Sequence, residues 1–350
     1  MKKILSVLLI TVLLVTVLAG CGSVSNTPDA KTSATPSTSN EASPSQEPEG
    51  PDYEAIDMRI AGMTGPTSMG MAKLMESADA GNAKNNYIFT IAGSADEITP
   101  KLIKGELDIA AVPANLAAVL YNNTDKKIKL LAVNTLGVLY IVEKGNEIES
   151  FTDLKGKTIY ATGKGSTPEY NLRYLLLQNG IDPDKDIKIE WKSEPNEVVA
   201  LLNSNESGVA MLPQPYVTIA QTQVEGLRTA VNLTEEWDKL DNGSAMITGV
   251  VVARSDFVDK YPEQIAAFLD EYKLSVEYVN ANMDEAAELI EKFGIFKAAV
   301  AKKALPYCNI AFMEGAGMKT AVSGYLSVLF EQNPKSVGGS LPDEGFYFAR

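Results

Sequence analysis

The chain has 350 residues, a formal net charge of −14 and no histidine. An acidic chain of this kind is a poor candidate for binding nucleic acid or an anionic membrane through its surface charge, so we expect no nucleic-acid partner. The lack of histidine excludes serine–histidine and cysteine–histidine nucleophile pairs and imidazole metal ligands. Two cysteines, Cys21 and Cys308, are too few for a zinc cluster. We therefore expect neither a metal nor a cofactor.

The N-terminal segment has the three-part layout of a secretory signal. Two lysines precede an apolar run from Ile4 to Leu18, which is shorter than the ~20 residues that span a bilayer. The Leu-Ala-Gly-Cys sequence that ends at Cys21 resembles the bacterial lipobox, whose cysteine is acylated after cleavage. This resemblance implies a signal peptide over residues 1–20 and a lipid anchor on the extracytoplasmic face of the cell membrane. An uncleaved or buried apolar helix is the alternative.

Residues 21–52 are rich in serine, threonine, proline and glutamate. This composition offers little apolar area to bury and predicts a disordered tether that begins at the lipidated Cys21.

From Ile56 onward, short apolar strands alternate with amphipathic helices, which predicts the α/β class with mainly parallel sheets. The first set has predicted strands at 58–63, 87–92, 108–112 and 128–133, and helices at 68–80, 95–104 and 114–122. The second set has strands at 157–162, 187–192, 209–212 and 247–253, and helices at 167–179, 197–203 and 215–223. Beyond these sets the chain is predicted to be helical, at 263–280, 284–292, 298–304 and 317–330.

Two α/β sets of similar size predict two lobes with a ligand cleft between them. The second set is short for an independent terminal domain, so we interpret it as an insertion. The predicted first lobe comprises residues 53–137 and 245–350, and the predicted second lobe comprises residues 138–244. Two chain crossings between the lobes would form a hinge.

Four passages resemble the solute-binding proteins of ABC importers. They are the Gly-Glu-Leu-Asp passage within 101–110, the Asp-Leu-Lys-Gly-Lys passage within 151–159, the helix start at 261–269 and the tail at 337–347. Their order is similar to that in the nitrate, sulfonate, taurine and thiamine-precursor binding proteins, the NMT1-like family. The resemblance covers residues 57–350. It implies the two-lobe type II periplasmic-binding-protein fold, which closes on its ligand by hinge bending.

Ligands of open α/β sheets bind beyond the carboxyl ends of the strands, where helix N-termini present unpaired amides. In the predicted first lobe, the candidate ligand-binding positions are Gly65, Pro66, Thr67, Ser68, Met69, Gly93, Ser94, Pro113, Ala114 and Asn115. An ordinary capped turn is the alternative at each of them.

In the predicted second lobe, the candidate positions are Gly165, Ser166, Thr167, Gln214 and Tyr216. Glu169, three residues after Ser166, also fits a capping box at this helix start. Thr135 and Thr248 lie where the lobes are expected to join, where each either contacts the ligand or only bends.

The resemblance implies a monomeric binding protein that is not an enzyme. Its expected partners are a small-molecule solute, an ABC permease and the ATPase of that permease. The expected solute is anionic or heterocyclic, such as nitrate, a sulfonate or a thiamine precursor. Two alternatives stay open. One is an enzyme on the same scaffold, such as a thiamine pyrimidine synthase, which relies on a histidine that this chain lacks, or a menaquinone-pathway lyase. The other is a lipoprotein that reports solute to a membrane sensor.

Overall fold

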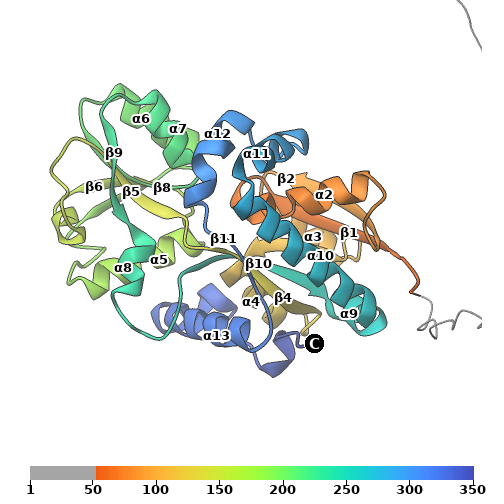
Figure 1. The fold of residues 1–350 in the computed structure, drawn as a ribbon. Helices are drawn as coiled ribbons and strands as arrows, with labels where there is room; N and C mark the ends of the chain where they lie inside the picture. The colour runs from red at the N-terminus through yellow and green to blue at the C-terminus, as the bar shows by residue number, and fades with distance from the viewer. Residues whose placement is uncertain (1–52) are drawn as a thin grey trace, which may run out of the picture. The chain divides into compact units, whose positions relative to one another are not determined.

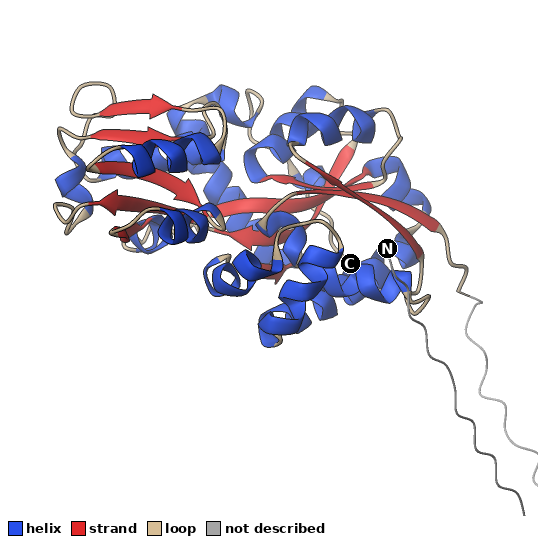
Figure 2. Ribbon diagram, turned by 90° about the horizontal axis from the view of Figure 1, so that it is seen from above, coloured by secondary structure: helices blue, strands red, loops and turns tan. Residues whose placement is uncertain are grey.

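Two β-sheets with helices packed on both sides organise residues 53–350, the part of the chain that the computed structural model describes (Figures 1 and 2). The predicted signal peptide, the tether and Cys21 lie outside the described residues. Within the described part, none of the helices has the length and apolar character needed to cross a bilayer. The α/β class predicted from the sequence is confirmed.

The first sheet has six strands in the order β11-β4-β10-β3-β1-β2. β1 pairs in parallel with β2 and β3, whereas β10 runs antiparallel between β3 and β4, and β11 runs antiparallel to β4. The strands are β1 (Asp57–Met63), β2 (Asn86–Ala92), β3 (Ile109–Pro113), β4 (Ile128–Leu136), β10 (Ile247–Arg254) and β11 (Ile310–Met313).

The second sheet has five strands in the order β7-β6-β8-β5-β9. β6 is parallel to β7 and β8, and β5 is antiparallel to β8 and β9. The strands are β5 (Leu139–Lys144), β6 (Thr158–Ala161), β7 (Lys188–Trp191), β8 (Gly208–Pro213) and β9 (Leu227–Asn232). Pairing in both sheets is thus mixed rather than mainly parallel, because β5 and β10, the strands by which the chain enters each sheet from the other, run antiparallel to both of their neighbours.

The chain passes between the sheets twice. It leaves the first sheet at Leu136 and enters the second at Leu139, and it returns through α8 (Leu233–Asp238) to β10 at Ile247. The predicted lobe boundaries, at 137/138 and 244/245, fall in these two connections. The described residues nevertheless form one compact unit, so the division into lobes stays a prediction.

Helices cover both faces of each sheet. Around the first sheet lie α1 (Pro66–Met69), α2 (Ala72–Asp79), α3 (Ala95–Ile103), α4 (Ala114–Asn123), α9 (Ser255–Lys260), α10 (Pro262–Ala281), α11 (Met283–Lys292), α12 (Ala298–Ala304) and α13 (Gly315–Gln332). Around the second lie α5 (Thr167–Gln178), α6 (Pro195–Ser204), α7 (Tyr216–Gln223) and α8. Short 3-10 turns occur at Phe151–Leu154, Leu305–Tyr307, Pro334–Val337 and Glu344–Phe346.

The helix predicted over residues 68–80 is two helices with a break at Gly70 and Met71. Ser275 of α10 explains the break, because its hydroxyl donates to the Gly70 carbonyl at 2.7 Å and accepts the Leu74 amide at 2.9 Å. A side chain from a helix about two hundred residues away therefore satisfies backbone groups that a continuous helix would pair internally. Sequence periodicity contains no signal for such a contact.

Three strands, β5, β9 and β11, are not among those predicted. The β5 segment is uniformly buried except at its last residue, and such short apolar runs lack the alternation that identifies a strand. β11 has only four residues and lies in a stretch that is otherwise helical.

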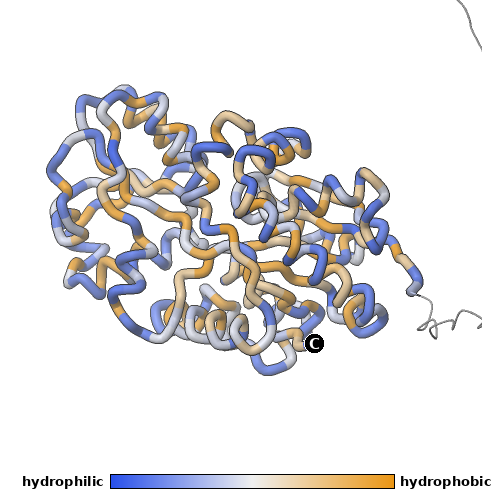
Figure 3. The backbone as a smooth tube through the Cα atoms, in the orientation of Figure 1, coloured by the Kyte–Doolittle hydropathy of each residue, from blue (hydrophilic) through white to orange (hydrophobic). Residues whose placement is uncertain are grey.

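The apolar core runs through both sheets, as the orange strand segments in Figure 3 show. One cluster of buried side chains lies on one face of the first sheet and continues beneath α5 and α8 into the second. Tyr325 of α13 and Trp237 of α8 belong to it, with ring centroids 5.5 Å apart. A second cluster fills the opposite face of the first sheet under α2, α10 and α11. The sheets are therefore joined by packing as well as by the two chain connections.

Asp108 explains the Gly-Glu-Leu-Asp passage in structural terms. Its side chain is buried, and it accepts the Arg59 amide at 2.9 Å and the Arg59 guanidinium at 2.8 and 2.6 Å. Arg254 lies 3.7 Å from the same carboxylate. Because Arg59 is in β1 and Arg254 ends β10, this one side chain links two strands to the start of β3. The passage is therefore structural and lies at the amino ends of β1 and β3.

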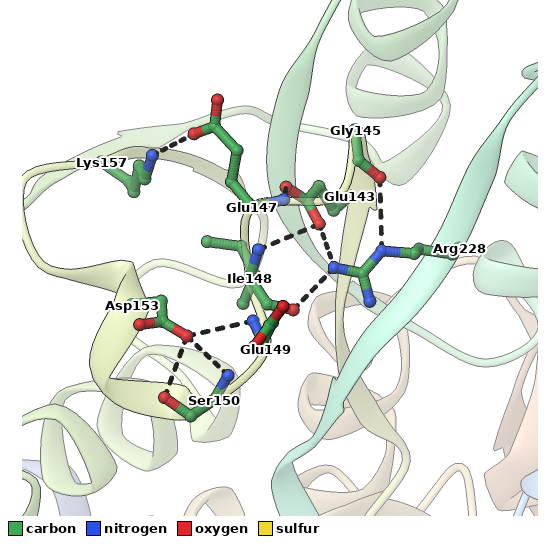
Figure 4. A network of polar contacts seen from close by, with 9 residues as sticks. All are labelled: Glu143, Gly145, Glu147, Ile148, Glu149, Ser150, Asp153, Lys157 and Arg228. Atoms are coloured by element: carbon green, nitrogen blue, oxygen red, sulfur yellow. Dashed lines mark hydrogen bonds and ion pairs between the residues drawn. The ribbon is translucent and has the colours of Figure 1, made fainter.

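A comparable buried carboxylate, Glu143, orders the turn that follows β5 (Figure 4). It accepts the amide of Glu147 at 2.7 Å and that of Ile148 at 3.3 Å, and it pairs with Arg228 of β9. The Arg228 guanidinium also donates to the Ile148 carbonyl at 2.6 Å. Asp153 caps the next turn through the Ser150 amide, which holds the pKa of the Asp153 carboxyl below its ordinary value.

Candidate ligand-binding site

The carboxyl ends of the first sheet's parallel strands meet the amino end of β10. Gly249, near the start of β10, is paired with Pro113 on one side and with Thr135 on the other. In the second sheet, Leu139 at the start of β5 is paired with Pro213 at the end of β8. Since the chain crosses between the sheets here, both sets of strand ends lie next to the crossing.

Nine polar residues lie along these strand ends and the adjoining helices. We call them the polar band: Thr67, Ser68, Asn115, Asn134, Thr135, Thr167, Asn171, Thr234 and Thr248. Five of them carry a buried side-chain atom without a hydrogen-bond partner in the described part of the chain: Thr67, Ser68, Asn171, Thr234 and Thr248. Each such atom costs about 1–3 kcal/mol unless a partner is supplied.

The loop after β1 places Thr67 and Ser68 in the band. Gly65 adopts φ +105°, which favours glycine and lets the chain turn directly into α1. Both hydroxyl-bearing side chains are buried. A Cβ on Gly62 would lie 2.1 Å from the Ser68 hydroxyl, so that glycine makes the space in which Ser68 sits. Met69 turns away from the band and packs in the core.

Asn134 connects this loop to the crossing. Its amide nitrogen donates to the Thr67 carbonyl at 2.9 Å, and its amide oxygen accepts the Thr135 hydroxyl at 3.1 Å. A Cβ on Gly249 would lie 2.6 Å from both the Asn134 oxygen and the Thr67 methyl group. These contacts place Thr67, Asn134 and Thr135 around Gly249, the neighbour of Thr248. Asn134 is not among the predicted site residues.

Thr167 and Asn115 join the helices of the two sheets. Thr167 opens α5, and its hydroxyl donates at 2.8 Å to the side-chain oxygen of Asn115 in the first turn of α4. The Asn115 nitrogen donates to the Ser336 carbonyl at 3.2 Å, which sets the orientation of the amide. Both side chains are buried. The N-termini of α4 and α5 therefore lie next to each other, as their predicted places beyond the strand ends require.

Asn171 follows Thr167 by one helical turn, so the two share a face of α5. The Tyr325 hydroxyl of α13 donates to the Asn171 oxygen at 2.7 Å, while the Asn171 nitrogen has no partner in the described part of the chain. Burial raises the pKa of Tyr325, so its hydroxyl stays protonated as a donor. Asn171 is not a predicted position, although its four-residue spacing from Thr167 is a signal that could have identified it.

Thr234 adds a hydroxyl from the returning connection. Its amide donates to the Asn232 side chain at 3.0 Å, which caps α8. A Cβ on Gly137 would lie 2.0 Å from the Thr234 hydroxyl. The two chain crossings therefore touch each other at Gly137 and Thr234. No local sequence pattern singles out Thr234.

Several predicted positions have their polar groups occupied locally. Gly93 and Ser94 are exposed, and both amides donate to Glu97 at 3.1 Å, as in a capped turn. Gly165 is also exposed, and its amide donates to Glu169 at 2.7 Å.

The capping box predicted for Ser166 and Glu169 is not formed. The Ser166 hydroxyl turns back to donate to the Gly163 carbonyl at 2.9 Å. The Glu169 carboxylate accepts the Gly165 amide rather than the Ser166 amide. This happens because Gly163 and Gly165 both adopt positive φ and fold the loop onto the start of α5.

The remaining predicted positions flank the band. Gln214 is buried and its side-chain oxygen accepts the Thr218 hydroxyl at 2.9 Å. Tyr216 packs edge-on against Phe296, with ring centroids 5.9 Å apart, and so joins α7 to the segment before α12. Gly65, Pro66, Pro113 and Ala114 contribute backbone at the starts of α1 and α4.

The band contains no charged side chain. Among residues 53–350, no lysine or arginine is buried, and the two buried carboxylates are Asp108 and Glu143. Each of these pairs with an arginine, at the amino end of β1 or at the carboxyl end of β5. The chemistry that the band offers is therefore hydrogen bonding by hydroxyls and amides.

Two helix-flanked sheets joined by two crossings, with strand ends facing each other, define the periplasmic-binding-protein fold, and the solved structures similar to this chain share it. An ABC transporter protein from Parabacteroides distasonis is 28% identical, with a TM-score of 0.70 over 84% of this chain and 99% of that one. The periplasmic aliphatic sulphonate binding protein of Escherichia coli is 16% identical, with a TM-score of 0.66 over 83% and 95%.

Residues 89–293, more than half of the chain, match the NMT1-like family, and the chain belongs to that family. A protein of Brucella abortus strain 2308, named as a proposed binding protein, is 25% identical over 167 residues, which are 48% of this chain and 50% of that protein. The chain spans about half the length of the curated relatives it matches. The family expected from the sequence is therefore confirmed.

Proposed function

We propose that this protein is the extracytoplasmic solute-binding component of an ABC importer and that it is not an enzyme. The observation that carries the proposal is the polar band, in which unpaired buried atoms come from elements of both sheets. Membership of the NMT1-like family and likeness to ABC-type binding proteins support it. The chain also lacks histidine, and its band has no acid or base suited to proton transfer.

Capture would proceed by closure of the second sheet and its helices onto the first. Neutral contacts join elements of the two sheets in this structure. Besides the bond from Thr167 to Asn115, the Tyr140 hydroxyl donates to the Tyr307 carbonyl at 3.1 Å, and Tyr216 packs on Phe296. A solute that adds hydrogen bonds only in the closed state shifts the equilibrium towards that state. The importer would then recognise the closed form.

The proposal includes the membrane anchor expected from the sequence. Lipidation of Cys21 and a tether up to residue 52 would hold a monomeric binding protein near its permease and ATPase. Metabolic labelling with a palmitate analogue tests this part, because Cys21→Ser should abolish incorporation whereas Cys308→Ser should not.

A thermal-shift screen followed by small-angle scattering tests the binding function. The screen would use nitrate, methanesulfonate, taurine, a thiamine pyrimidine and riboflavin. A true ligand at ~1,000 times its dissociation constant stabilises the folded state by about 4 kcal/mol. The radius of gyration should then fall on addition of that ligand. An unchanged radius at saturation would rule out capture by closure.

A further inference from the structure

We propose that the captured solute carries no net charge and is held by hydrogen bonds to the neutral side chains of the polar band. This inference rests on the proposed function and specifies the chemistry of its ligand. Of the anionic and heterocyclic solutes expected from the sequence, it excludes the anionic ones. It follows from which buried groups are unpaired and from where charges lie.

Most of the unpaired buried atoms belong to the polar band. Six buried side-chain polar atoms lack a partner among residues 53–350, and five belong to the band. They are the hydroxyls of Thr67, Ser68, Thr234 and Thr248 and the amide nitrogen of Asn171. The sixth, the Tyr272 hydroxyl, lies 3.5 Å from where a Cβ on Gly70 would be, next to α1. Since buried polar groups are normally paired within the fold, such a concentration indicates a ligand that completes them.

The same region contains no buried cationic side chain to neutralise an anion. An ion that leaves water without a counter-ion loses hydration that neutral hydrogen bonds repay poorly. No lysine or arginine among residues 53–350 is buried. The N-terminus of α5, which would otherwise attract an anion, already has the Glu169 carboxylate in its first turn, bonded to the Gly165 amide at 2.7 Å. The net charge of −14 adds repulsion at longer range.

The hydrogen-bond donors and acceptors of the band restrict the class of solute further. The Asn171 oxygen already accepts the Tyr325 hydroxyl, whereas the Asn171 nitrogen, which donates, has no partner in the described part of the chain. The threonine and serine hydroxyls can donate or accept. The matching solute therefore has an uncharged acceptor, such as a carbonyl or ring nitrogen, facing Asn171, and hydroxyl or amine groups elsewhere.

The first experiment measures the melting temperature of the wild-type protein with sodium nitrate, methanesulfonate and sulfate at millimolar concentrations. Sodium chloride at equal ionic strength is the matched control. We expect no shift beyond that caused by chloride. A saturable rise with any of the three anions would overturn the inference while leaving solute capture intact. Failure of charged and uncharged solutes alike to bind would instead count against the proposed function.

The second experiment needs no ligand. Thr67→Val and Thr234→Val remove hydroxyls that have no partner in the described part of the chain, so each should raise the melting temperature by about 2 °C or more. Thr218→Val is the matched control, since its buried hydroxyl donates to Gln214 at 2.9 Å, and it should lower the melting temperature. If the band variants also lowered it, those groups would be paired within the fold and the inference would fail.

Discussion

The hydroxyl of Thr167 and the side-chain oxygen of Asn115 form a buried hydrogen bond of 2.8 Å between a helix of the second sheet and a helix of the first. The bond places two helix N-termini side by side. It also distinguishes Thr167 from Thr67, Thr234 and Thr248 of the band, whose hydroxyls have no partner in the described part of the chain.

Replacing Thr167 by valine should therefore destabilise the protein, in contrast to the same change at Thr67. The substitution leaves the Asn115 oxygen buried without its donor, so we expect the free energy of unfolding in urea to fall by about 1 kcal/mol. Thr320→Val, at an exposed position of α13, is the matched control and should change it by less than about 0.5 kcal/mol. If Thr167→Val and Thr320→Val changed the free energy of unfolding by the same amount, the bond from Thr167 to Asn115 would contribute nothing to stability.

Asp108→Asn should be among the most destabilising single-atom changes in the first sheet. The carboxylate accepts three bonds from Arg59, and hydrogen bonds to charged groups contribute about 1.5–3 kcal/mol each. Arg59 is 41% exposed and thus partly screened, so we expect a loss of about 2 kcal/mol in urea unfolding rather than the sum. Asp256→Asn, whose carboxylate pairs with Arg254 but is 74% exposed, is the control. A loss no larger than that of the control would contradict the structural role of Asp108.

Asp343 should contribute to the acid sensitivity of folding. Hydrogen bonds from Lys126 and Tyr121 lower the pKa of its carboxyl from 3.8 to about 2. A group whose pKa is lowered on folding stabilises the protein above its unfolded pKa, and this contribution is lost as the pH falls. The stability difference between wild type and Asp343→Asn should therefore be full above about pH 4 and shrink towards pH 2.

Chemical denaturation at several pH values measures that difference directly. Tyr121→Phe removes one of the two side-chain donors, so it should shift the carboxyl titration of Asp343 upward in an NMR experiment. A difference between wild type and Asp343→Asn that stayed constant from pH 5 to pH 2 would exclude the role.

Cys308 should be unreactive in the native protein. Its side chain is fully buried, and burial raises the pKa of the thiol to about 12, so little thiolate exists near neutral pH. Iodoacetamide should label Cys308 only after unfolding in urea. In the Cys308→Ala variant only Cys21 is left to react. Subtracting the labelling of this variant from that of the wild type therefore gives the labelling of Cys308. Rapid native labelling of Cys308 would show that the core around α12 and β11 opens.

Local pattern and general topology together account for where some residues of the band lie. Thr67, Ser68, Asn115 and Thr167 were predictable because they follow strands or begin helices, and strand ends of one sheet edge lie together. Three other residues of the band were not predictable, because their place depends on distant contacts. Asn134 contacts Thr67, Asn171 contacts Tyr325, and Thr234 lies against Gly137. Those contacts join segments that lie from about seventy to more than one hundred and fifty residues apart.

The amino-acid sequence by itself determined the α/β class, the family and the order of most elements, because hydrophobic periodicity and short motifs are local properties of the chain. Only the tertiary structure decided how the strands pair, why α1 and α2 are separate helices, and which polar atoms remain unpaired. Those outcomes depend on which distant groups reach hydrogen-bonding distance. For Thr67 and Thr167 that is the whole difference: the same side chain is unpaired in one place and joins two sheets in the other.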